Sequence, residues 1–128
     1  MSVYFSLNLQ QRLEAADDHC CAYCRTSSLN TGQSLTVDHI ILQSQGGETT
    51  FENLCLACRR CNEFKGTQVI AQDPLTGECV PLFHPRQQAW QEHFTWDAAG
   101  VLLVGLTAVG RATILALNMN NPVIVAVR

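Results

Sequence analysis

The chain has no apolar run long enough to span a bilayer. Its first residues, Met1-Ser2-Val3-Tyr4-Phe5-Ser6, lack the basic start and apolar centre of a signal peptide. Positive charge is also scarce, because 8 Lys and Arg stand against 11 Asp and Glu and the net charge is −3. We therefore expect a cytoplasmic protein, in which disulfide bonds are rare. The acidic balance also counts against a protein that binds nucleic acid by overall charge alone.

Cysteine, in contrast, is abundant, with 7 in 128 residues. Four of them form two CxxC pairs, Cys21/Cys24 and Cys58/Cys61. Tetrahedral structural zinc commonly uses four thiolates, and a good site contributes about 10 kcal/mol or more to folding. Either pair alone is also compatible with a redox site, but two pairs in one chain predict structural zinc. The remaining cysteines are expected to be buried free thiols: Cys20, Cys55 and Cys79.

The first half of the chain predicts two helices and a strand. Apolar spacing predicts a helix over residues 8–16, capped by Asn8, with Gln11 completing a capping box. Residues 35–42 are rich in β-branched side chains and predict a strand. A helix is expected over 58–65, with Gly66 ending it.

The second half predicts a hairpin followed by helices. Strands over 94–96 and 101–106 are expected to pair through a turn at 97–100. Thr107 is a predicted N-cap for a helix over 108–118. Asn121-Pro122 favours the start of a last helix, with a strand over 123–127 as the alternative.

Four polar residues lie between or just after the cysteine pairs: Asp38, His39, Asn53 and Asn62. Hydrolysis of a phosphodiester needs a base for water, and a neutral His suits that role near pH 7. It also needs an electrophile, such as a hard cation held by oxygen ligands. Asp38 offers a carboxylate and Asn62 an amide oxygen. Because adjacent strand residues point to opposite faces, Asp38 and His39 must converge through a local twist or act from either side of the phosphate.

Six short stretches follow one another in a specific order: Cys21-x-x-Cys24, Val37-Asp38-His39-Ile40, Gly46-Gly47, Asn53-Leu54, Cys58-x-x-Cys61-Asn62 and Lys65-Gly66. In this order and spacing the chain resembles the HNH endonuclease family over residues 8–66. The resemblance implies an α+β fold with a ββα-metal core, stapled by the four-cysteine zinc site. We expect this core over residues 1–70 and a C-terminal extension, a β-hairpin and helix packed on the core, over 71–128.

The resemblance also implies roles for the four polar residues, which we take as the catalytic set. His39 corresponds to the general base, and Asp38 to the carboxylate ligand of a catalytic cation. Asn53 corresponds to the central Asn, which holds the catalytic loop and orients the base. Asn62 stands where the family often has its last His, and an amide oxygen there favours Mg²⁺ or Mn²⁺ over softer metals. The product implied carries a 5′-phosphate.

Three basic residues flank the predicted 58–65 helix: Arg59, Arg60 and Lys65. They have two equally weighted interpretations, contact with phosphate or a solvated helix face. Residues 79–128 resemble the tail of small stand-alone bacterial HNH proteins, which implies no chemistry. His84 and Arg86 in that tail are expected to be structural.

The sequence thus predicts a metal-dependent endonuclease that acts on DNA. One alternative is a non-catalytic zinc module that binds nucleic acid or protein, although such a module has no need of Asp38, His39 and Asn53 together. Another is an RNA-directed nuclease, because the chemistry at phosphorus is the same. The oligomeric state is left open, with a dimer as one option because a double-strand break often needs two active sites.

Overall fold

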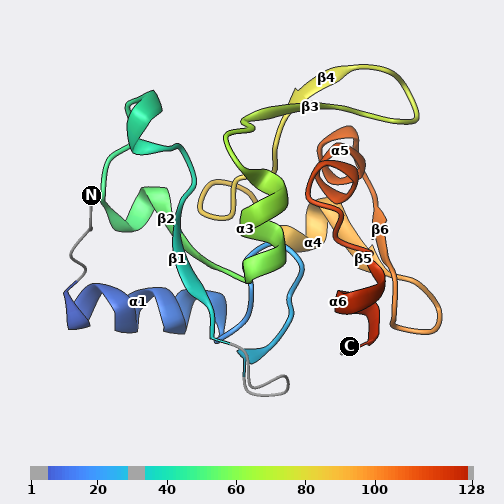
Figure 1. Cartoon of the computed structure of the whole chain (residues 1–128). Coiled ribbons are helices and arrows are strands. Elements are labelled where there is room, and N and C mark those ends of the chain that lie inside the picture. Colours follow the sequence, from blue (N-terminus) through green and yellow to red (C-terminus); the bar gives the residue numbers. More distant parts are fainter. Residues whose placement is uncertain (1–5, 29–33, 127–128) are drawn as a thin grey trace.

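The computed structural model describes residues 6–28 and 34–126 and mixes helices with short antiparallel strands, as an α+β protein does (Figure 1). Residues 1–5, where no signal peptide was expected, and Val127, in the alternative last strand, lie outside this description. None of the helices within the described ranges is long and apolar enough to cross a membrane.

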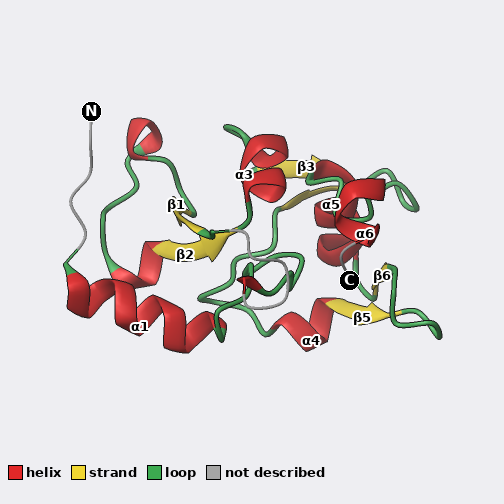
Figure 2. Cartoon of the chain, turned by 60° about the horizontal axis from the view of Figure 1, so that its bottom comes forward, coloured by secondary structure: helices red, strands yellow, loops and turns green. Residues whose placement is uncertain are grey.

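Helix α1 (Leu7–Asp17) lies along the β1–β2 hairpin (Figure 2). Its N-cap is Ser6, whose hydroxyl accepts a hydrogen bond from the N–H of Leu9 at 3.1 Å. The predicted cap at Asn8 is therefore wrong, because the helix has already begun when the chain reaches that residue. Leu13 is fully buried on the inner face of α1 and packs with Leu54 and Leu56 of β2.

The central hairpin pairs β1 (Thr36–His39) with β2 (Leu54–Ala57), and α3 (Arg59–Lys65) follows directly. Asp38 lies opposite Cys55 in this register, and His39 opposite Leu54. The predicted strand over 35–42 stops early because the next two N–H groups bond to Asn53 rather than to a strand. Helix α3 ends at Gly66 as predicted, with a φ of 51° that suits glycine.

Two short 3₁₀ turns, η1 (Gln43–Gln45) and η2 (Phe51–Asn53), lie in the loop between the strands of this hairpin. A second hairpin, β3 (Ile70–Gln72) with β4 (Cys79–Pro81), follows α3. Only the turn of this hairpin was predicted, because three-residue strands are too short to show a periodic pattern of apolar residues. A short helix, α4 (Trp90–His93), also went unpredicted.

The remaining elements agree with the sequence. Strands β5 (Phe94–Trp96) and β6 (Leu103–Gly105) form the predicted hairpin, and the Asp97 side chain accepts from two N–H groups of its turn. Helix α5 (Ala108–Ala116) is capped by the Thr107 hydroxyl and ends two residues short of prediction. The last element is a helix, α6 (Pro122–Ala126), rather than a strand.

The cysteine pairs and the C-terminal half share one core. The indole N–H of Trp90 donates to the Tyr23 carbonyl at 2.8 Å, which joins α4 to the turn that holds the first pair. Tyr23 and Trp90 are both buried. The cluster around them contains all four paired cysteines and several residues from the C-terminal half: Phe83, Phe94, Leu103, Leu117 and Met119.

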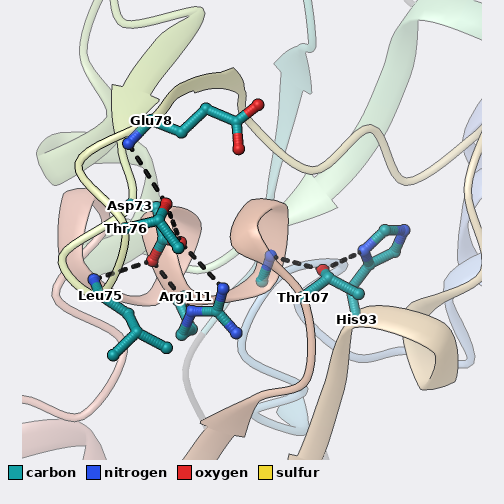
Figure 3. A network of polar contacts seen from close by, with 8 residues as sticks. Asp73, Leu75, Thr76, Glu78, His93, Thr107 and Arg111 are labelled. Atoms are coloured by element: carbon teal, nitrogen blue, oxygen red, sulfur yellow. Dashed lines mark hydrogen bonds and ion pairs between the residues drawn. The ribbon is translucent and has the colours of Figure 1, made fainter.

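A buried carboxylate joins the β3–β4 turn to α5 (Figure 3). Asp73 is fully buried and accepts from Arg111 through Nε at 2.9 Å and Nη2 at 2.8 Å. It also accepts from the Thr76 hydroxyl and the Leu75 N–H. These hydrogen bonds, those from Arg111 first, hold the pKa of Asp73 well below its ordinary value. The turn is therefore fixed to α5 by a charged anchor.

Candidate functional site

The two CxxC pairs come together as a four-sulfur cluster. Cys21, Cys24, Cys58 and Cys61 are buried, and their Sγ atoms all lie within 4.8 Å of one another. The Sγ atoms of Cys24 and Cys58 are 3.7 Å apart. A tetrahedral zinc with Zn–S bonds of about 2.3 Å needs sulfur atoms separated by about 3.8 Å. The four cysteines are thus positioned to hold a metal such as zinc.

Local structure places the second pair. Cys58 is the N-cap of α3, and its Sγ accepts from the N–H of Cys61, 3.4 Å away. The Thr26 hydroxyl lies 3.0 Å from Cys24 Sγ. Hydrogen bonds from neighbouring thiols, that of Cys21 first, lower the pKa of Cys24 and Cys58. The pKa values of Cys21 and Cys61 are raised instead, that of Cys21 mainly by burial and that of Cys61 mainly by its hydrogen bond with Cys21, so two of the four thiols favour the thiolate form that a metal ligand takes.

The three other cysteines differ from one another. Cys55 is buried as predicted, and burial raises the pKa of its thiol far above the ordinary value, which makes it inert. Cys20 is only half-buried. Cys79 is exposed on β4, so the prediction that it is buried is wrong. Successive strand residues point to opposite faces, and in β4 the buried face belongs to Val80, so Cys79 points to the exposed side of the hairpin.

Asp38 faces inward from β1, with 6% of its surface exposed. Its Oδ2 lies 3.4 Å from Lys65 Nζ, close enough for an ion pair. The contact is not directed as a hydrogen bond, and this oxygen has no hydrogen-bond partner among the described residues. Burial raises the pKa of Asp38, and the Lys65 ammonium partly offsets that rise. Strand β1 therefore presents a buried carboxylate oxygen that has an ion-pair partner but no hydrogen bond.

Lys65 was considered as a contact to phosphate from an exposed face of α3, but its side chain does not lie on such a face. Only 2% of it is exposed. Its ammonium also approaches the carbonyl oxygen of His39 at 3.4 Å. Lys65 thereby ties the last turn of α3 to β1 at the two residues proposed for chemistry, a role that the spacing of basic residues did not reveal.

His39 is half-buried at the end of β1. Its Nε2 lies 2.9 Å from the Thr49 hydroxyl, in the loop that follows. The side-chain amide of Gln43 donates to the same hydroxyl at 3.3 Å. Thr49 is a residue that the sequence analysis missed, because an isolated Thr in a polar loop carries no signal of its own.

Asn53 holds that loop in shape. Its amide nitrogen donates to the carbonyls of Ile41 at 2.9 Å and Glu48 at 2.8 Å. Its Oδ1 accepts from the Ile41 N–H at 2.9 Å. Gly47 packs so closely against this framework that a Cβ there would lie 1.8 Å from the Ile41 carbonyl oxygen. The side chain of Asn53 thus holds the loop through Ile41 on one side of the turn and Glu48 on the other. Its influence on His39 is exerted through that loop.

The other predicted residues lie on α3. Asn62 is exposed, one helical turn before Lys65, and so lies on the same side of the helix. Arg59 and Arg60 are exposed too, and Arg59 Nε pairs with Glu63 at 2.8 Å. The structure therefore joins Asp38 and the carbonyl of His39 to Lys65 of α3, while Asn62 lies one turn earlier on the exposed part of that helix.

The two tail residues have structural surroundings. Arg86 donates to both oxygens of Asp17 at 2.8 Å and to the Leu54 carbonyl at 2.9 Å. His84 Nδ1 accepts from the Arg86 N–H at 3.2 Å, and burial lowers the pKa of His84. These contacts agree with the structural role expected for Arg86.

Residues 21–68 match the protein-family model described as HNH endonuclease. The stretch includes all four paired cysteines and every residue of the predicted catalytic set, so the resemblance is confirmed for this part of the chain. Comparison with curated proteins and with solved structures gave no match.

Proposed function

We propose that the HNH endonuclease domain at residues 21–68 is an active, metal-dependent nuclease that hydrolyses phosphodiester bonds in DNA and leaves a 5′-phosphate. The support comes from how the candidate residues are held. The β1–β2–α3 order is the order of a ββα-metal core, with the cysteine cluster at the base of α3. We take this arrangement as that core.

His39 acts as the general base in this proposal. We assign Nε2–H as the donor in the hydrogen bond with the Thr49 hydroxyl, which leaves Nδ1 of the neutral imidazole unprotonated. Nδ1 then takes the proton from water as the water attacks phosphorus. Asn53 positions the base indirectly, because it fixes the loop that carries Thr49.

A divalent cation, Mg²⁺ or Mn²⁺, would be held by the Asp38 carboxylate and the Asn62 amide oxygen. The donor set fits a hard cation, because it consists of oxygens and includes the buried Oδ2 that lacks a hydrogen bond. When bound, such a cation stabilises negative charge on the leaving oxygen. Lys65 keeps Asp38 and the His39 carbonyl on the α3 side of the hairpin.

Arg59 and Arg60 are the proposed contacts to phosphate, because both are exposed beside Asn62. Lys65 is better supported as a residue that positions Asp38, since its side chain is buried. The Arg59–Glu63 pair is solvent-exposed and weak, so it does not prevent Arg59 from turning to a phosphate.

One observation carries the proposal: the Thr49 hydroxyl that contacts His39 lies on a loop whose shape depends on three side-chain hydrogen bonds made by a single Asn, Asn53. A module that only binds does not require such control of one imidazole, which disfavours the non-catalytic alternative. An RNA substrate stays the second alternative.

The remaining assignments belong to the same proposal. We place the nuclease core at residues 1–70 and the packed extension at 71–128. The zinc site is structural, and the location is the cytoplasm. A dimer is proposed only for cleavage of both strands.

The test is cleavage of supercoiled plasmid with Mg²⁺ or Mn²⁺ by three zinc-loaded proteins: the natural chain, His39→Ala and the control His19→Ala. His19 is exposed beside the first cysteine pair and has no proposed role. We expect nicking or linearisation by the natural chain and His19→Ala, and a loss of about 100-fold or more for His39→Ala. Equal cleavage by all three proteins would refute the assignment of the base. Cleavage of RNA but not plasmid would select the second alternative, and inactivity on both would favour the binding module.

A further inference from the structure

A cavity of about 320 Å³ lies directly beside the candidate catalytic residues. One wall is Ile40 and Ile41, which follow His39 in the chain. A second wall is the end of α3 and the segment after it, through Lys65, Gln68 and Val69. The third is the segment after β4, which Figure 1 shows passing beside α3 on its way to α4.

The cavity and the candidate site share structural elements. The N–H groups of Ile40 and Ile41 both donate to Asn53. The residue that shapes the loop carrying Thr49 therefore also fixes the first wall of the cavity. Lys65 lines the cavity and contacts Asp38 and the His39 carbonyl. The cavity thus adjoins the candidate site through Ile40, the residue after His39, and through Lys65.

The cavity is lined by apolar side chains and by neutral polar groups. Ile41, Val69 and Leu82 provide apolar surface, and Gln68, Gln87 and Gln88 provide side-chain amides. Among the described residues that line the cavity, only Lys65 is a Lys or Arg, and it is already paired with Asp38. A phosphate therefore finds no uncommitted Lys or Arg there.

The polar side chains whose orientation is fixed by other contacts, Gln88 and His84, present N–H donors to the cavity. Gln88 Oε1 accepts from the His84 N–H at 2.8 Å, which leaves its NH₂ group as a donor. Because His84 Nδ1 accepts from the Arg86 N–H, the neutral imidazole carries its proton on Nε2. Amide side chains hydrogen-bond to base edges, and apolar walls suit base faces.

We infer that this cavity binds one unstacked nucleobase of the strand being cut, next to the scissile phosphate. The volume is near the lower end for ligand sites, which suits one base rather than a stacked pair. A base enters such a cavity only after it leaves the stack, so the inference predicts a preference for single-stranded or locally opened DNA. It rests on the proposed function and specifies the substrate further.

The experiment moves a single abasic site, one nucleotide at a time, across the mapped cleavage position of a short single-stranded DNA. We expect one position, adjacent to the cut, at which KM rises roughly 5- to 150-fold, the range for losing one bound base. Binding is measured in parallel with His39→Ala and a 2-aminopurine at that position. The 2-aminopurine fluorescence should change on binding when the base is at that position, and not when it is at other positions of the strand.

Two variants test whether the cavity is responsible. Val69→Trp fills it from the rim, where Val69 is 36% exposed, and should abolish the dependence on the abasic position. Leu75→Trp is the matched control, since Leu75 is 74% exposed in the β3–β4 turn and does not line the cavity. Ile41→Trp replaces Val69→Trp if the latter loses zinc or folds poorly.

Cleavage with no position-dependent effect of the abasic site would overturn the inference and leave the nuclease proposal intact. So would a Val69→Trp protein that keeps the dependence. Failure of the natural chain to bind or cut any DNA would instead overturn the proposed function, and the inference with it.

Discussion

Replacing Arg86 with methionine should destabilise the protein by about 3–5 kcal/mol, the cost of removing one partner from a buried ion pair. The side chains of Arg86 and Asp17 are only 9% and 4% exposed. Two hydrogen bonds of 2.8 Å join them. Arg86 also donates to the Leu54 carbonyl and lies over the Phe51 ring, 4.8 Å from its centroid. Methionine fills much of the same space but leaves a buried carboxylate with one N–H partner, that of Leu56.

The expected loss of stability comes from leaving the Asp17 carboxylate buried without its cation, rather than from losing the contact itself. A double variant, Asp17→Asn with Arg86→Met, should therefore lose less than the sum of the single variants. Arg59→Met is the matched control, because its ion pair with Glu63 is 85% and 54% exposed and should be worth less than about 1 kcal/mol. A typical domain has a free energy of unfolding of about 5–15 kcal/mol, so the difference between the two variants is large.

The assay is urea unfolding followed by tryptophan fluorescence, with zinc saturating and the pH at 7. Trp90 lies in the core shared by the cysteine cluster and the C-terminal half, so it reports on their separation. We expect a lower midpoint with an unchanged slope. A loss below about 1 kcal/mol for Arg86→Met, or additive single variants, would refute the reasoning from burial.

Three further outcomes are expected. Cys58→Ser should lose bound zinc and folded structure, measured by metal analysis and circular dichroism, whereas Cys79→Ser, at an exposed thiol, should keep its zinc. Thr49→Val should lower kcat by up to about 100-fold and change the pH profile of cleavage, because the hydroxyl that selects the His39 tautomer is lost. Thr49→Ser keeps the hydroxyl and should restore both kcat and the profile. A Thr49→Val protein with an unchanged pH profile would remove Thr49 from the mechanism. The pKa of Asp73 is lower in the folded state than in the unfolded state, where it is about 4. Its contribution to the free energy of unfolding is therefore complete above that unfolded-state pKa and is lost as the pH falls below it. Asp73→Asn should therefore be less stable at neutral pH and lose less stability on acidification in a thermal-unfolding series, and parallel curves for the two proteins would contradict this.

The sequence alone determined the features that depend on local spacing. The CxxC pairs predicted a four-sulfur cluster because metal ligation needs that spacing, and the cluster is present. Thr107 and Gly66 marked helix ends because capping depends on a few adjacent atoms. The resemblance to the HNH endonuclease family, predicted over residues 8–66 and matched by the family model over residues 21–68, rested on the same kind of local pattern.

The tertiary structure decided what depends on residues distant in the chain. Whether Lys65 faces solvent or Asp38 depends on how α3 packs on β1, which no local pattern encodes. Thr49 meets His39 only because Asn53 folds the intervening loop. Arg86 reaches Asp17 across 69 positions of sequence. Cys79 is exposed because the side of a hairpin that a residue occupies is set by packing. Burial and long-range pairing are collective properties of the folded chain, so these partners emerged only with the fold.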